Sequence, residues 1–278
     1  MILAQQLVLQ GNAALTGFIG ILNVLAPSYA LDRNLNKSVK LDNELYLLTY
    51  FQAMVMLMFS ALLFDLSRRA LSYNSLFFLA WSNALIASKF LYNALFAPAM
   101  SSNWDLTTTV LSSACSAYYF YSALSFPKIM AKETTMQNGR IMKWVFLADL
   151  FFHVIEGASF LFAPRIVVSL FLPISNLNWV DERLITLQTA LYFFADALLI
   201  LANMYDMNDR NTFTIGFGHA IYAVLHALMW IGFTEMRTIA NMTFFLKDVL
   251  FMLLFLWASL QDQTNFNRDK KEQLEKNS

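Results

Sequence analysis

The chain has 278 residues and no net formal charge; 58% of its residues are hydrophobic and 14% are charged, and its mean hydropathy is +0.49. Soluble domains carry about 25% charged residues, so this composition excludes an ordinary soluble surface, and the lack of a basic excess argues against nucleic acid as a partner. A single cysteine, Cys115, excludes an intrachain disulfide. We therefore expect an integral membrane protein surrounded by a lipid bilayer.

Eight apolar segments follow one another along the chain, each close to the ~20 residues that a helix needs to cross a bilayer. We expect spans at Leu7–Leu31, Leu45–Phe64, Ser75–Ala97, Leu106–Phe126, Trp144–Ala163, Leu184–Ala202, Phe213–Phe233 and Ile239–Leu260. The apolar stretch Ile166–Ile174 is too short to span and is expected to be interfacial or re-entrant. The predicted fold class is all-α, a polytopic membrane protein of about eight transmembrane helices.

Basic residues are distributed unevenly between the two sides of this arrangement. With eight spans both termini share one side, which carries eleven Lys and Arg in its loops and tail, against six on the other side. Because cytoplasmic loops are enriched in basic residues, both termini are expected on the inner side. The polar tail after Gln261 is expected to lack regular structure. The sequence does not identify the membrane; the endoplasmic reticulum and the mitochondrial inner membrane both fit.

The two halves of the chain share a pattern. Gly20–Pro27 lines up with Gly157–Pro164, since each begins with Gly and ends in Ala-Pro. Further matches keep offsets between 136 and 139 residues, including Ala84–Ala87 with Ala220–Ala223. We therefore expect a repeat at 1–130, a second at 140–262 and a polar inner-side tail at 263–278. Since four helices per repeat is an even number, the repeats are expected to be parallel, related by an axis along the membrane normal.

Ionisable residues gather within the predicted spans of the second half. They form the candidate intramembrane polar site: Asp149, His153, Glu156, Asp196, His219, His226, Lys247 and Asp248. Spacings of four and three place the first three on one face of the fifth span, and His219 and His226 share one stripe of the seventh. A charge at the bilayer centre costs about 2.5–3.5 kcal/mol on insertion scales, so each of these residues needs a physical reason.

The first half is neutral at the matching positions of its first helix. Asn12, Thr16 and Ile19 stand where the fifth span has its acidic and histidine side chains, and Lys89 is the charge that remains in the third span. Asn83 stands opposite His219 in the same alignment. This asymmetry is the main functional clue in the sequence, because it makes the first half resemble a scaffold for the second.

Several interpretations of the polar site stay open. In the structural interpretation, ion pairs such as Lys247 with Asp196 or Glu156 only hold helices together. In the functional ones, the site performs acid–base chemistry on a lipid-soluble substrate, binds a metal, or carries a retinal Schiff base at Lys247. The order His153-x-x-Glu156 differs from the Glu-x-x-His pair of di-iron bundles, so no metal ligand set is predicted and the cofactor, if any, is unknown.

The first helix of each half ends in Gly, apolar residues and Ala-Pro, at Gly20–Pro27 and at Gly157–Pro164. This pattern resembles the four-helix membrane units of the DoxX-like group. The passage 203–210, followed by 214–226, resembles the four-helix endoplasmic-reticulum scaffold of sterol synthesis. The chain differs from both in being duplicated and in carrying charges in its fifth to eighth spans. The resemblance implies an accessory, chaperone or scaffolding component and transfers no residue-level function.

The sequence therefore favours a non-enzymatic structural or accessory subunit of a membrane complex, with other membrane-protein subunits as partners. The alternative is a protein whose polar intramembrane site binds, isomerises or transports a hydrophobic small molecule, an ion or a proton. His153, Glu156 and Asp196 would carry that activity.

Overall fold

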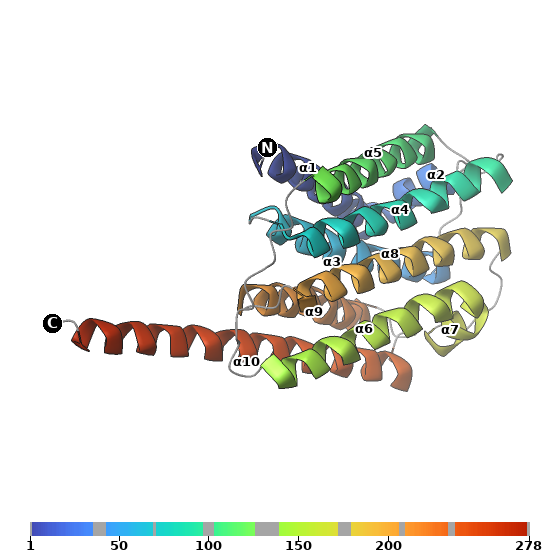
Figure 1. Ribbon diagram of the computed structural model, residues 1–278. Helices are drawn as coiled ribbons and strands as arrows, with labels where there is room; N and C mark the ends of the chain where they lie inside the picture. Colours follow the sequence, from blue (N-terminus) through green and yellow to red (C-terminus); the bar gives the residue numbers. More distant parts are fainter. Residues whose placement is uncertain are drawn as a thin grey trace.

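The helices of the protein lie side by side in one elongated bundle (Figure 1). The computed structural model describes residues 2–35, 43–68, 71–96, 103–125, 139–171, 179–205, 209–232 and 237–276, and all regular structure within these ranges is α-helical. The elements are α1 (Ile2–Leu25), α2 (Pro27–Leu35), α3 (Asn43–Leu66), α4 (Tyr73–Phe96), α5 (Asn103–Ser125), α6 (Gly139–Phe162), α7 (Pro164–Phe171), α8 (Trp179–Tyr205), α9 (Asp209–Gly232) and α10 (Ile239–Lys276). Some of the loop Lys and Arg residues that were counted to predict the orientation in the membrane, such as Lys37 and Lys132, lie outside these ranges.

Six of the described helices are long and apolar enough to cross a membrane: α1, α3, α6, α8, α9 and α10. By length and composition the chain is therefore a multi-pass membrane protein. Helices α4 and α5 are of similar length, with 24 and 23 residues, but Ser, Thr and Asn recur along them and lower their hydropathy. Composition therefore supports six of the eight expected spans within the described residues, and α4 and α5 are more polar helices packed beside them.

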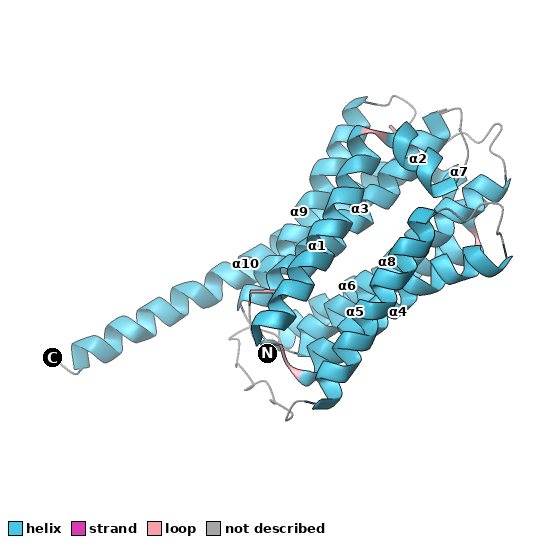
Figure 2. Ribbon diagram, turned by 90° about the horizontal axis from the view of Figure 1, so that it is seen from above, coloured by secondary structure: helices cyan, strands magenta, loops and turns pink. Residues whose placement is uncertain are grey.

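Both short helices begin at a proline. Helix α2 starts at Pro27 and α7 at Pro164, where the missing N–H and the fixed φ of proline suit the first turn of a helix. The expected single helix Leu7–Leu31 was therefore wrong, because α1 ends at Leu25. Helices α2 and α7 lie at the same end of the bundle, opposite the N-terminus (Figures 1 and 2). The expected end of the short stretch at Ile174 lies outside the described residues.

Helix α10 is much longer than a span. It has 38 residues, and its C-terminal part leaves the bundle and projects beyond it (Figures 1 and 2). The expectation of no regular structure after Gln261 was wrong. Residues 261–276 contain no proline or glycine and continue a helix that is already formed, so each added residue meets only the small cost of helix propagation.

Helices α3 and α8 form the centre of the bundle. In their apolar segments 78% and 72% of the residues are buried, against 22–50% in the other four apolar helices. Helix α3 packs against α1, α8 and α9, and α8 packs against α6, α3 and α4. The other long helices pack around this central pair.

The helix contacts occur in matching pairs. Helix α1 packs on α3 as α6 packs on α8, and α4 packs on α5 as α9 packs on α10. Helix α4 packs extensively on α8, and α9 packs on α3, so each half places its third helix against the central helix of the other half. The third long helix of each half therefore packs across on the other half, while α5 and α10 pack on α4 and α9.

Two glycines make the close approaches beside the central pair. A Cβ at Gly157 would lie 3.1 Å from a ring carbon of Phe194 and 3.2 Å from the backbone oxygen of Ala190, both in α8. A Cβ at Gly20 would lie 3.0 Å from Leu57 and 3.5 Å from the backbone oxygen of Ala53, in α3. Each glycine thus meets the residues 33 and 37 positions further along the chain. These contacts require a small residue at both positions.

Replacing Gly157 with Leu should destabilise the fold by about 1–3 kcal/mol, because the added side chain has no room between α6 and α8. Thermal unfolding of the detergent-solubilised protein measures the change. Gly232→Leu is the matched control, since nothing lies within 4 Å of a Cβ at Gly232. Equal stability of the two variants would contradict the close packing of α6 on α8.

Candidate functional site

The polar residues that the sequence singles out in the second half converge in the bundle. Their side chains come from α6, α8, α9 and α10, and all are buried except that of Lys247, which is 12% exposed. We call this group the ionic cluster: Asp149, His153, Glu156, Asp196, His219, His226, Lys247 and Asp248. The structure thus brings together all eight candidate residues.

Asp149 joins α6 to α9. Its Oδ1 lies 3.1 Å from Nδ1 of His153, one turn further along the same helix, and 3.1 Å from Nε2 of His219. Nδ1 of His153 is also 3.0 Å from the backbone oxygen of Asp149. Because that oxygen can only accept, Nδ1 donates this hydrogen bond when it carries a proton. The carboxylate therefore sits between two imidazole rings in a site without solvent exposure.

Asp248 joins α9 to α10. Its Oδ1 lies 3.4 Å from Nδ1 of His219, and its Oδ2 lies 3.1 Å from Nδ1 of His226. Lys247 pairs with Glu156 of α6, and its Nζ is 3.4 Å from Oδ1 of Asp248. The contacts therefore run continuously across three helices, with acidic groups on both sides of His219.

Asp196 of α8 joins the cluster through a residue that the sequence analysis missed. Tyr222 donates a hydrogen bond of 3.2 Å from its hydroxyl to Oδ2 of Asp196, and its ring stacks on that of His153 with centroids 6.1 Å apart. Tyr222 lies three residues after His219 and four before His226, on one helical stripe. That spacing was the available signal. A tyrosine among apolar residues does not stand out unless its neighbours on the helix face are considered.

Helix packing positions the cluster. A small residue at Gly216 lets α9 approach α10, since a Cβ there would lie 3.0–3.1 Å from Leu256 and Phe255. The ring of His219 then packs against Phe251 and Phe255, with centroids 5.2 and 5.9 Å away. These aromatic contacts fix the histidine between its two carboxylate partners.

Charge balance limits what the cluster can do. With neutral histidines, the four carboxylates and Lys247 would leave three negative charges uncompensated at membrane depth. Isolated buried charge is costly, so protons must be held within the cluster, on the imidazoles or on the carboxyl groups. Nε2 of His153 is buried without a hydrogen-bond partner among the described residues, and it is a free position for a proton. The chemistry that the arrangement supports is proton binding and exchange.

The structure gives less support for a metal ion or for a Schiff base at Lys247. Within the described part of the chain, no group of three or more His, Cys, Asp or Glu side chains is placed to hold a metal ion. Lys247, the position considered for a Schiff base, is engaged by two carboxylates.

The polar residues of the first half form separate contacts. Lys89 of α4 donates a hydrogen bond to Oε1 of Gln188 in α8. Asn12 of α1 donates a hydrogen bond of 2.8 Å to Oδ1 of Asn83 in α4. Neither contact includes a member of the ionic cluster.

The fold and the site define a multi-pass α-helical membrane protein with a buried ionic cluster. Comparison with protein-family models, with curated proteins and with solved structures finds no match. The resemblance to the DoxX-like group and to the sterol-synthesis scaffold therefore stays an expectation from the sequence.

Replacing Lys247 with Met should destabilise the protein by about 3–5 kcal/mol, because Glu156 and Asp248 lose their shared cation inside the bundle. Adding Glu156→Gln should recover part of the loss. Lys143→Met, at an exposed position of α6, is the control and should be close to neutral. Denaturant or thermal unfolding in lipid nanodiscs measures all three. If Lys247→Met matched the control, the ion pair would hold no helices together.

Proposed function

We propose that the chain crosses the membrane eight times as two parallel repeats, 1–130 and 140–262, with both termini and the tail on the inner side. The matching helix contacts support this arrangement, as do the equivalent surroundings of Gly20 and Gly157. A polar contact supports it as well. Asn12 bonds Asn83 in the first half where, 137 and 136 residues later, Asp149 pairs with His219.

Helices α4 and α5 are not among the six helices that composition identifies as spans. Cysteine labelling tests whether they cross the membrane. In a Cys115→Ser background, Ser101→Cys in the connection between them should react from the side of the membrane opposite to Arg68→Cys, which follows α3. Membrane-impermeant maleimide applied to sealed, oriented vesicles measures the side. Labelling of both positions from the same side would reduce the number of spans to six.

The function proposed for this membrane protein is proton binding at membrane depth, of the kind that proton-coupled carriers and pumps require. One observation carries the proposal: four carboxylates, three histidines and one lysine meet in a continuous buried network. If ion pairing alone were needed to hold the helices, one acid and one base would suffice. The excess of carboxylates over permanent cations makes the network a reservoir for protons.

The protein offers a clean readout, because all three of its histidines belong to the cluster. Asp149→Asn removes a negative charge between His153 and His219, so the variant should bind about one proton fewer per chain near neutral pH. Potentiometric titration of the protein in nanodiscs measures the difference from wild type.

Asp65→Asn, near the end of α3 and outside the cluster, is the matched control and should titrate like wild type near neutral pH. If wild-type protein bound no protons in this range, or if Asp149→Asn titrated like the control, the proposal would be wrong.

A second candidate is the accessory or scaffolding role that the sequence favours. The projecting part of α10 supports it, because a polar helix that leaves the bundle offers a partner an extended surface outside the membrane. In this case the ionic cluster ties α6, α9 and α10 together and takes up no proton near neutral pH. A native mass well above that of one chain, together with absence of proton uptake, would favour this role.

A further inference from the structure

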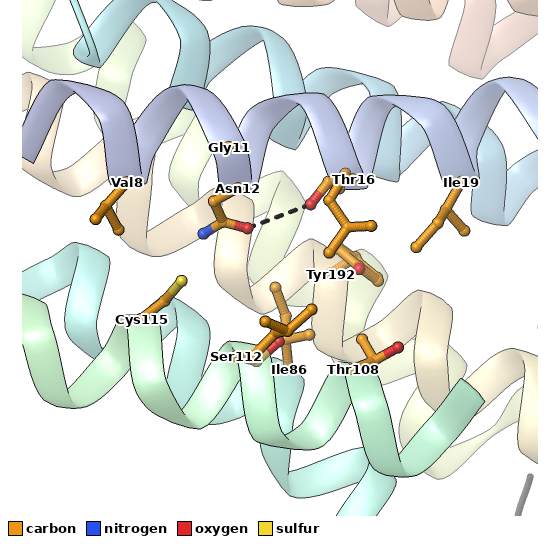
Figure 3. Close-up of a pocket in the computed structure, with 12 residues that line it drawn as sticks. Val8, Gly11, Asn12, Thr16, Ile19, Ile86, Thr108, Ser112, Cys115 and Tyr192 are labelled. Atoms are coloured by element: carbon orange, nitrogen blue, oxygen red, sulfur yellow. Dashed lines mark hydrogen bonds between the residues drawn. The ribbon is translucent and has the colours of Figure 1, made fainter. Parts of the chain in front are cut away.

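A cavity of about 330 Å³ lies in the first half, between α1 and α5 (Figure 3). Asn12 and Thr16 of α1 face Thr108, Ser112 and Cys115 of α5 across it, and α4 and α8 contribute one lining residue each. Cavities that bind small molecules occupy about 300–1,000 Å³, so this one can hold a slender ligand.

The cavity corresponds in position to the ionic cluster. Counted back by 137 residues on α6 and by 136 on α10, five cluster residues correspond to lining residues. These pairs are Asp149 with Asn12, His153 with Thr16, Glu156 with Ile19, Lys247 with Leu111, and Asp248 with Ser112. This equivalence rests on the repeat proposed above. The same space is thus filled by paired charges in one half and left open in the other.

The lining determines the kind of ligand. The cavity wall has no Lys, Arg, His, Asp or Glu among its described lining residues, so a charged ligand would find no counter-charge. Most of the area that the wall exposes to the cavity is apolar. Ser112 is 9% exposed and lines the cavity (Figure 3), so its hydroxyl can bond an oxygen atom of a ligand. These properties suit an uncharged molecule with an apolar body and one hydrogen-bonding group.

The two helices that border the cavity, α1 and α5, also carry exposed apolar side chains that suit contact with lipid. Leu7 and Phe18 on α1 are exposed, as are Leu106 and Val110 on α5, so both helices turn apolar side chains outward. Gly11 lines the cavity, and nothing lies within 4 Å of a Cβ built there, so the wall is open at this point. A lipid-soluble molecule can reach the cavity from the bilayer without crossing water.

We infer that the cavity between α1 and α5 binds a neutral lipid-soluble molecule with a single apolar chain and one hydroxyl or carbonyl group. The chain lies along the apolar wall, and its oxygen atom contacts Ser112.

Cys115 reports on the occupant, because it lines the cavity and is the only cysteine of the chain. Hexadecanol is the probe, and the rate of N-ethylmaleimide labelling of the solubilised full-length protein is the readout. With free hexadecanol about tenfold above its Kd, the labelling rate should fall by about tenfold and in a saturable manner. The palmitate anion should protect far less, because the cavity offers it no cation.

Two variants make the test specific. Gly11→Phe places a ring in open space at the cavity and should abolish protection by hexadecanol without a clash in the fold. In a Cys115→Ser background, Leu124→Cys moves the thiol to the exposed lipid-facing surface of α5, where hexadecanol should not slow labelling.

Absence of protection in wild type would overturn the inference, as would equal protection at Leu124→Cys or in Gly11→Phe. Equal protection by palmitate would overturn the assignment to uncharged ligands. The readout involves no proton, so its failure is distinct from failure of the proton-binding proposal.

Discussion

The contact between α3 and α8 is the constraint on which the rest of the structure depends. These are the two most buried of the apolar helices, and each supports helices from both halves of the chain. Since lipid tails are as apolar as the side chains they would replace, hydrophobicity alone does not drive helices together in a membrane. Close approach is needed instead, and Gly20 and Gly157 supply it where α1 and α6 meet the central pair.

Under the repeat proposed above, the two halves would use one arrangement around this centre for different chemistry. In the second half, acidic and basic side chains meet between α6, α9 and α10, and pairing offsets a cost of about 2.5–3.5 kcal/mol for each buried charge. At the positions that this repeat equates in the first half stand amide, hydroxyl and apolar side chains, and the Asn12–Asn83 bond makes a cross-helix contact without charge. On that alignment, the cavity would lie where the second half has its paired charges. Protons and a neutral ligand would thus occupy equivalent places in one protein.

The sequence predicted which residues belong to the ionic cluster better than it predicted which of them pair with one another. Helical spacing placed Asp149, His153 and Glu156 on one face, and the cost of charge in lipid identified the other members. Which groups pair depends on how α9 and α10 approach α6, and this distance information is absent from a single sequence; Tyr222 was missed for the same reason. In the fold, the break between α1 and α2 could have been predicted, because Pro27 favours the start of a new helix. The prediction of one helix instead gave more weight to the length of the apolar segment. The packing of α4 on α8 and of α9 on α3 could not be predicted, since a single sequence does not say which helices of different halves lie side by side.

The packing of α4 on α8 has a consequence for biosynthesis. Helix α4 leaves the ribosome well before α8, on which it packs, and the Gln188 acceptor of Lys89 follows 99 residues later. At about 5–20 residues per second, that interval is about 5–20 s. During this time the insertion machinery must shelter a lysine within a moderately polar helix that lacks its final neighbour. The first half therefore cannot complete its folding before α8 has been translated, which ties the final packing of α4 to the synthesis of the second half.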